Sequence, residues 1–323
     1  MPRSDWVRAS ANQVSADPSA ARPCASGRVS PTTSVKTTSS ARGVMRVMAA
    51  DLTILRVQLA VSIAGSDPTG GAGLQLDLQV FRALGVHGAG VVTALTVQDT
   101  VKVHRVLPAF PNVVRDQIRV LLRDVAPSAV KLGMLATDDV ARAVALGLDE
   151  LKGPALRARQ VPIVIDPVLL ASDGTPLLER RAYGTLIALF ERSTLVTPNL
   201  PEAAQLAERD VSSAEGIENA GRVFVTEFGA AAALVKGGHR DGPCDDCLVR
   251  REDAGIRIRW LPGERIAGPP VHGTGCALAA AAAAGLAAGQ DLDTAVQSAR
   301  AFVAAGIRRA HAPGRGSRLL VFP

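Results

Sequence analysis

The sequence has 323 residues, of which 47% are hydrophobic and 20% charged, and this composition is that of a globular protein with a large core. Aromatic residues make up only 3%, which argues against a surface that stacks nucleobases on aromatic rings. Because residues 1–50 carry five of the six net positive charges, the rest of the chain is nearly neutral, and we expect no nucleic-acid partner.

Residues 1–50 are rich in Ser, Thr, Ala, Pro and Arg and have no sustained apolar period, which is typical of a disordered basic extension. Three explanations remain open for this segment: an organelle transit peptide, a solvated extension, or sequence upstream of a true start at Met45 or Met48. The folded pattern begins directly afterwards, so we expect one domain over residues 51–323.

From residue 57 onward, short runs rich in β-branched residues alternate with helical patterns. The predicted strands are residues 57–64, 91–97, 129–134, 161–166, 195–197 and 232–236. The predicted helices are residues 74–81, 114–125, 138–148, 183–190 and 213–228. This alternation predicts an α/β fold with a mostly parallel central sheet and helices on both faces. Ligands are then expected at the carboxyl ends of the strands.

A glycine-rich loop, residues 65–73 with the sequence GSDPTGGAG, leaves the first strand and opens the first helix. Glycines there let the backbone approach a ligand closely, and a helix start supplies free N–H groups. The loop matches neither the dinucleotide-binding pattern nor the P-loop. A plain turn explains it equally well when it is taken alone.

Polar residues follow three of the later predicted strands: Asp166, then Asn199 and Glu202, and finally Lys236. Acidic and amide groups at the carboxyl ends of parallel strands are suited to Mg²⁺ and ATP phosphates. We therefore predict Asp166 and Glu202 at a metal, and Asn199 and Lys236 at ATP, where the lysine would offset phosphate charge. Each residue taken singly is also explained as a helix cap or a surface charge.

The four cysteines are too few and too unevenly spaced for a disulfide framework, which indicates a reducing compartment and a cytoplasmic protein. Cys244 and Cys247 form a single C-x-x-C, and because a structural zinc site needs four ligands, we expect a solvent-facing loop there. The longest apolar run, residues 276–289, is shorter than the roughly 20 residues of a membrane-spanning helix. We expect no membrane partner.

The motif HGTGC at residues 272–276 precedes this alanine-rich run. Gly273 and Gly275 flank Thr274, so consecutive backbone N–H groups can converge at a helix N-terminus as an anion hole for a phosphoryl group in transfer. Cys276 would lie in the first turn, where the helix dipole lowers the pKa of a thiol and lets it accept a proton from a substrate hydroxyl. The alternative is a buried and inert small residue.

In their joint order these motifs resemble the hydroxymethylpyrimidine kinase family over residues 57 to about 311. The matching stretches are SIAGSDPTGGAGLQLDLQVF, GVVTALTVQDT, VKLGML, VIDPVL, VTPNLPEA, VKGGH and HGTGCALAAA. Seven motifs in register are very specific. The resemblance implies a ribokinase-like fold, ATP with Mg²⁺, a homodimer, and two successive phosphorylations of hydroxymethylpyrimidine to its diphosphate, the pyrimidine half of thiamine.

Position by position, the resemblance implies that Asp77 and Gln98 contact the pyrimidine and that Ala72, Gly73 and Met134 line its pocket. It also implies an anion hole built from the backbone of residues 273–276, with the cysteine near the reacting hydroxyl. Most of the wider superfamily carries aspartate at that last position. Cysteine is shared with some pyridoxal kinases and does not by itself name the substrate.

Two other functions remain open from the sequence. A pyridoxal or pyridoxine kinase would use the same scaffold, and a non-catalytic sensor would bind the pyrimidine without turnover. Intact candidates for both the metal and the anion hole argue against a sensor. Residues 241–259 match no pattern of the family, and AGPP precedes VHGTGC where related enzymes often have an Asn-Thr pair.

Overall fold

Strands from most of the chain join one central sheet in the computed structural model, which describes residues 58–153, 160–238 and 244–322. Within those residues the sheet has nine strands in the order β3-β2-β1-β4-β5-β6-β7-β8-β9. The strands are β1 (Leu59–Ser66), β2 (His87–Gln98), β3 (Val103–Pro108), β4 (Ala129–Leu132), β5 (Ile163–Ile165), β6 (Leu195–Val196), β7 (Ala232–Val235), β8 (Asp246–Glu252) and β9 (Gly255–Leu261). The expectations for residues 1–50 lie outside the described residues.

The six adjacent strands β2, β1, β4, β5, β6 and β7 run parallel, which confirms the prediction of a mostly parallel sheet. Strand β3 joins one edge and the hairpin of β8 and β9 the other, all antiparallel. A separate two-stranded ladder pairs β10 (Val271–His272) with β11 (Arg318–Leu319) in parallel. This ladder ties the chain just before the alanine-rich run to the C-terminal end of the protein.

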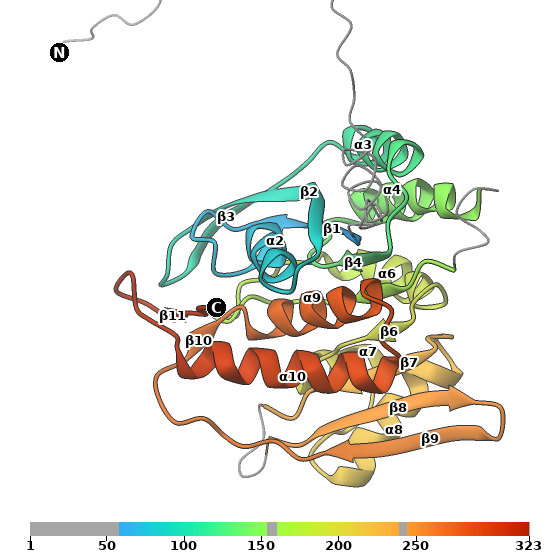
Figure 1. Cartoon of the computed structure of the whole chain (residues 1–323), viewed down its shortest axis with the longest axis vertical. Helices are drawn as coiled ribbons and strands as arrows, with labels where there is room; N and C mark the ends of the chain where they lie inside the picture. The colour runs from blue at the N-terminus through green and yellow to red at the C-terminus, as the bar shows by residue number, and fades with distance from the viewer. Residues whose placement is uncertain (1–57, 154–159, 239–243, 323) are drawn as a thin grey trace, which may run out of the picture. The chain divides into compact units, whose positions relative to one another are not determined.

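Helices cover both faces of the sheet, as predicted (Figure 1). They are α2 (Gly73–Ala83), α3 (Pro111–Asp124), α4 (Asp138–Gly147), α6 (Tyr183–Phe190), α7 (Leu200–Ala207), α8 (Ala214–Thr226), α9 (Thr274–Ala287) and α10 (Leu292–Arg308), with short 3-10 helices η1 (Leu148–Lys152) and η2 (Arg180–Ala182). Buried side chains of α3, α4, α6, α7 and α8 pack in one core, and those of α2, α9 and α10 in a second core. None of the described helices combines the length and the apolar character needed to cross a bilayer.

The central strands are short and continuously apolar because they are covered on both faces. All residues of β4, β5 and β7 are buried, and their sequences AVKL, IVI and AALV contain a single charged residue, Lys131. A lysine in such a strand is unusual, since lysine is almost never fully buried unless it is paired. Its partner belongs to the site described below.

Helix α9 is the alanine-rich run, and all of its residues from Ala277 to Ala284 are buried. It packs on β1, β4 and β5 and between α2 and α10, so it is apolar on every side. Alanine side chains allow this close approach to the sheet. The helix begins at Gly273, whose φ of +77° is in the left-handed region. A Cβ on Gly273 would collide with the carbonyl oxygen of Gly71 in the glycine-rich loop.

The predicted elements agree with the observed ones to within a few residues, and the differences lie mostly at the sheet edges. Strand β3, the β8–β9 hairpin, α7 and α10 were not predicted. The expectation of a solvent-facing loop at the C-x-x-C is wrong, because Cys247 lies on β8 and is fully buried against the core. Burial raises the pKa of its thiol to about 12. Cys244 is half-buried and lines the cavity described below.

The turn at Gly273 gives a prediction with a matched control at the other end of α9. Gly289 has a φ of +85° but no atom within 4 Å of an added Cβ. We expect Gly289→Ala to lower the free energy of unfolding by about 1–2 kcal/mol through backbone strain alone. Gly273→Ala adds the collision with Gly71, so we expect it to lower the free energy of unfolding by at least about 2 kcal/mol more than Gly289→Ala does. Urea unfolding of the two variants measures the difference, and equal losses would show that the contact between the two glycine loops is unimportant.

Candidate active site

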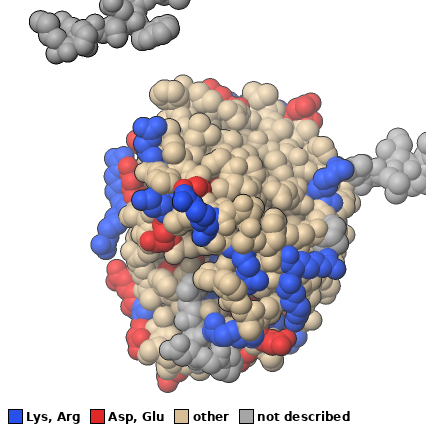
Figure 2. Space-filling view, turned by 90° about the vertical axis from the view of Figure 1, so that its left-hand side faces the viewer, with Lys and Arg blue, Asp and Glu red and all other residues tan. Residues whose placement is uncertain are grey.

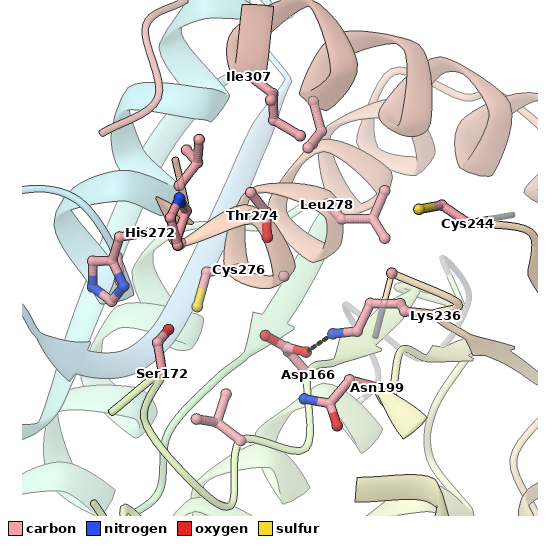
Figure 3. Close-up of a pocket in the computed structure, with 18 of the residues that line it drawn as sticks. Asp166, Ser172, Asn199, Lys236, Cys244, His272, Thr274, Cys276, Leu278 and Ile307 are labelled. Carbon is pink, nitrogen blue, oxygen red and sulfur yellow. Dashed lines mark hydrogen bonds and ion pairs between the residues drawn. The ribbon is translucent and has the colours of Figure 1, made fainter. Parts of the chain in front are cut away.

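A cavity of about 1270 Å³ opens at the carboxyl ends of the central strands, beside the start of α9 (Figure 3). Ligands bind at this edge of the sheet in open α/β folds. All residues predicted for the site line the cavity except Asp77. The structure thus brings together Ala72, Gly73, Gln98, Met134, Asp166, Asn199, Glu202, Lys236, Gly273, Thr274, Gly275 and Cys276.

The N-terminus of α9 forms one wall of this cavity. Gly273 is the N-cap and has no side chain to satisfy the first N–H groups of the helix, which belong to Thr274, Gly275 and Cys276. Free N–H groups and the helix dipole together favour an anion at this place. A Cβ on Gly275 would lie 3.0 Å from Lys236 Nζ, so glycine leaves room for a charged group directly against the helix start.

Lys236 and Asp166 face this helix start from the ends of β7 and β5 (Figure 3). Lys236 Nζ donates to Asp166 Oδ1 at 2.9 Å, and Thr197 Oγ1 donates to the same oxygen at 3.2 Å. Burial works against the charge of Asp166, but the attraction of Lys236 and Lys131 outweighs it and lowers the pKa of the carboxyl. Burial also opposes the charge of Lys236, yet its acidic neighbours raise the pKa of its amine. Both groups are therefore ionised at neutral pH.

Asn199 and Glu202 form a capping box at the start of α7. The side chain of Asn199 accepts from Glu202 N at 2.9 Å, and Glu202 Oε2 accepts from Asn199 N at 2.8 Å. The helix-cap interpretation of these residues is therefore confirmed as local structure. Both side chains nevertheless line the cavity. Burial raises the pKa of Glu202 to about 7, although Lys236 acts to lower it.

The carboxylates of Asp166 and Glu202 are of the kind that a magnesium ion prefers. Among the described side chains, no group of three or more His, Cys, Asp or Glu is arranged to hold a metal ion. Mg²⁺ is, however, commonly held by one or two carboxylates together with waters and substrate phosphates. The charge of Asp166 helps to raise the pKa of Glu202, so the two carboxylates repel one another within the cavity. The donor set therefore fits a cation that is shared with a phosphate.

The opposite end of the cavity contains the residues predicted to contact the substrate ring. Gln98, at the end of β2, has its Nε2 at 3.1 Å from Nε2 of His272. The same imidazole nitrogen lies 3.3 Å from Asp67 Oδ2 in the glycine-rich loop. Met134 packs against Gly65, where an added Cβ would lie 2.7 Å from its sulfur. This part of the cavity wall is therefore apolar at Met134 and Gly65 and polar at Gln98, His272 and Asp67.

Asp77 is placed differently from the expectation that it contacts the pyrimidine. It is fully buried on α2, outside the cavity lining, where Oδ2 accepts from Lys131 Nζ at 2.8 Å and from Ser62 Oγ at 2.6 Å. Its Oδ1 has no hydrogen-bond partner among the described residues. Lys131 is fully buried too and lines the cavity. In this geometry the carboxylate of Asp77 is held by Lys131 and Ser62 and lies outside the cavity lining, so its expected contact with the pyrimidine stays a prediction.

Lys131 carries its charge inside the protein. Burial opposes that charge, but the attraction of Asp77, with a contribution from Asp166, outweighs it and raises the pKa of the amine, while burial raises the pKa of the Asp77 carboxyl although Lys131 and Ser62 act to lower it. The signal for Lys131 was visible in the sequence as a lysine inside the apolar strand AVKL, but no role was assigned to it. His272 was likewise visible in HGTGC and was not assigned. The contacts of both side chains come from residues far away in the chain.

Cys276 differs from the expectation of a thiol with a lowered pKa. Burial raises the pKa of the thiol to about 12, and the charges of Asp166 and Asp77 add to this effect, whereas Lys131 and a hydrogen bond from the backbone of Gly73 oppose it. The thiol is therefore protonated at neutral pH in the absence of ligands. Its position in the first turn of α9, inside the cavity, is as predicted (Figure 3).

Comparison with known proteins finds one family over most of the described chain. The family model for phosphomethylpyrimidine kinase matches residues 67–320. A Rhizobium meliloti (strain 1021) protein named hydroxymethylpyrimidine/phosphomethylpyrimidine kinase is 41% identical over 253 residues, which is 78% of this chain and 91% of the relative. The match includes all of the motifs that line the cavity except the first two residues of the glycine-rich loop.

Two solved structures share the fold, with similar TM-scores and similar sequence identities to this chain. Bacillus subtilis pyridoxal kinase, solved as an ADP complex, superposes with a TM-score of 0.72 and is 28% identical, covering 82% of this chain and 97% of that one. Phosphomethylpyrimidine kinase from Clostridium difficile 630 superposes with a TM-score of 0.66 and is 29% identical, covering 77% and 99%. The fold alone therefore does not discriminate between the two substrates.

The buried pair of Asp77 and Lys131 gives a prediction about stability. Asp77→Asn leaves the charge of Lys131 without its partner, and we expect it to lower the free energy of unfolding by about 3–5 kcal/mol. Lys131→Met removes that buried charge. The double variant should therefore be more stable than Asp77→Asn alone, and urea unfolding of the two single variants and the double variant measures this coupling. Additive losses in the double variant would contradict a direct charge pair.

Proposed function

Because the chain belongs to the phosphomethylpyrimidine kinase family, we propose that it phosphorylates hydroxymethylpyrimidine and then its monophosphate, with ATP as the donor, to give the diphosphate used in thiamine synthesis. The protein is a phosphotransferase with the ribokinase-like fold of these kinases. The observation that carries the proposal is the start of α9. It opens into a single cavity that holds ionised Lys236 and Asp166 on one side and Gln98 on the other.

In the proposed phosphoryl transfer, the residues of this chain position the reacting groups and stabilise the charge of the phosphates. The N–H groups of residues 274–276 would stabilise the charge on the phosphoryl group in transfer. Lys236 would offset the charge of the ATP phosphates, with Asn199 beside it. Asp166 and Glu202 are the residues that would hold Mg²⁺, which, when bound, neutralises charge on the phosphates.

The residues around Gln98, at the end of the cavity away from Lys236, support hydroxymethylpyrimidine as the substrate. A primary amide offers one acceptor and two hydrogens, so Gln98 can pair with an aminopyrimidine edge that carries a ring nitrogen and an exocyclic amine. Ala72, Gly73 and Met134 supply the apolar wall for the ring. Pyridoxal has no aminopyrimidine edge.

A pyridoxal kinase is the second candidate function, and the similarity to the Bacillus subtilis enzyme favours it. A binding protein without catalysis is disfavoured, because it has no need for charged groups at the start of α9. Both alternatives use the same cavity, so only turnover separates them from the proposed function.

A second copy of the chain is the proposed partner in a cytoplasmic homodimer. The β2–β3 hairpin exposes large apolar side chains, with Leu95 54%, Val97 45% and Leu107 41% exposed. Figure 2, which views the side of the molecule where this hairpin lies, shows a broad upper area without charged side chains. Such an area favours a protein contact over free solvent.

The proposed function is tested by coupled ADP release with the full chain, Mg²⁺ and ATP, and three separate substrates. We expect turnover with hydroxymethylpyrimidine and with its monophosphate, and much less with pyridoxal. Turnover of pyridoxal alone would establish the second candidate. Absence of turnover with all three, together with binding of the pyrimidine by calorimetry, would establish the sensor.

Replacement of Gln98 tests how the ring is recognised. Gln98→Met keeps the approximate volume and removes both polar groups, which leaves the aminopyrimidine edge unpaired at a cost of about 1–3 kcal/mol. We expect kcat/KM for hydroxymethylpyrimidine to fall by about 5- to 150-fold and the value for pyridoxal to change less. Gln117→Met on the exposed face of α3 is the control for the chemical change. An unchanged preference would mean that Gln98 does not recognise the pyrimidine.

Replacement of Cys276 tests whether the thiol accepts the proton of the substrate hydroxyl. We expect Cys276→Ala to lower kcat by about 10²-fold or more while the KM for ATP changes little. A thiol acts as a base only when ionised, so kcat/KM of the natural enzyme should still rise with pH well above neutrality, towards its pKa of about 12. In Cys276→Asp this rise should move to lower pH, because a carboxyl has a reference pKa of about 3.9. Full turnover in Cys276→Ala would leave only the backbone N–H groups in the mechanism.

A further inference from the structure

His272 lies at the point where three distant segments meet. It belongs to β10, whose pairing with β11 holds its backbone immediately before α9. Its imidazole Nε2 lies 3.1 Å from Gln98 Nε2 and 3.3 Å from Asp67 Oδ2. The side chain is 16% exposed and lines the cavity. Figure 3 places His272 and Lys236 on opposite sides of Cys276, so the imidazole is on the substrate side.

The two partners of Nε2 require opposite hydrogen-bonding roles of this nitrogen, one as a donor and the other as an acceptor. An imidazole nitrogen either carries a hydrogen and donates or lacks one and accepts, while an amide nitrogen only donates and an ionised carboxylate only accepts. Nε2 therefore serves either Asp67 or the amide nitrogen of Gln98. The proton on His272 and the direction of the Gln98 amide are consequently set together.

Asp67 is the stronger of the two partners. It is almost fully buried, and Oδ1 accepts from Thr69 N and Thr69 Oγ1, both at 2.9 Å, which holds the carboxylate in place. Burial opposes its charge, but the hydrogen bonds of His272 and Thr69 lower the pKa of the carboxyl, so it is ionised. A hydrogen bond to an ionised group is roughly twice as strong as one between neutral groups.

We propose that His272 is a positioning residue that sets the direction of the Gln98 amide, and that Asp67 selects this direction by holding a hydrogen on Nε2. The amide then turns by half a rotation, so that Oε1 faces Nε2 and shares its single hydrogen with Asp67 in a bifurcated hydrogen bond, and the NH₂ group faces the cavity. The substrate ring must present an acceptor to this NH₂ group and its exocyclic donor to Oε1. This inference rests on the proposed function, and it defines the order of donor and acceptor by which the site would recognise an aminopyrimidine.

The first test determines which nitrogen of the His272 imidazole carries the hydrogen, in the full-length protein without any substrate. Histidine is labelled with ¹⁵N, and the His272 signals are identified by their loss in His272→Leu. We expect Nε2 to carry the hydrogen in the natural protein. In Asp67→Asn the side-chain amide can donate to Nε2, so the hydrogen should move to Nδ1. A natural protein with its hydrogen on Nδ1, or an Asp67→Asn variant with no change, would overturn the proposal.

The second test is a double-mutant cycle in kcat and KM. We expect His272→Leu to raise the KM for hydroxymethylpyrimidine about tenfold or more, with kcat and the KM for ATP changed less than about threefold. On a Gln98→Met background the same replacement should add less than about twofold, because His272 acts through Gln98. Fully additive effects, or an equal rise in the KM for ATP, would overturn the proposal.

A matched control and an independent measurement separate the possible failures. His104→Leu disrupts another His–Asp contact, with Asp99 at 3.0 Å, on the surface and outside the cavity lining, and it should leave the kinetics unchanged. The ¹⁵N measurement does not depend on the substrate. If hydroxymethylpyrimidine is not phosphorylated, the proposed function fails while the state of His272 is still determined.

Discussion

The close packing of α9 on the central sheet is the constraint on which the rest of the site depends. Only small side chains allow the helix to lie against β1, β4 and β5 while its first turn meets the glycine-rich loop. That position brings the free N–H groups of residues 274–276 over the ends of the strands. A bulkier helix would move away from the sheet and separate the anion site from the charged groups opposite it.

Beneath this helix start, buried charges of alternating sign extend across the ends of the strands. Asp77 pairs with Lys131, and Asp166 pairs with Lys236. A buried pair is weak support for stability, since removing two charges from water costs several kcal/mol per ion. Their presence at the cavity is better explained by a highly charged ligand, whose own charge is then balanced by groups that are already fixed in place.

Much of this architecture could be predicted from the sequence, because hydrophobic period and glycine position depend on neighbours in the chain. The parallel strands, the helix at residues 138–148 and the HGTGC turn are examples. Burial and pairing depend on distant residues, and the sequence alone does not predict them. Asp77 follows the helical pattern of its own segment, but Lys131 from another strand takes its carboxylate. Cys276 has the helix position that lowers a pKa, but desolvation outweighs it. The β8–β9 hairpin was missed because its arginine-rich alternation resembles a solvated surface.

The wide separation of the site residues along the chain has a consequence for biosynthesis. Gln98 and His272 are 174 residues apart, and the ladder that holds His272 closes only when β11 is present. Strands β1 to β7 all precede α9 in the chain and leave the ribosome before it, and partly folded chains of this size transiently expose hydrophobic surface. Until the last fifty or so residues emerge, the face that α9 covers has no partner and exposes apolar side chains of the sheet and α2. The chain is therefore most exposed to aggregation just before it becomes active, and the same late step completes both the core and the site.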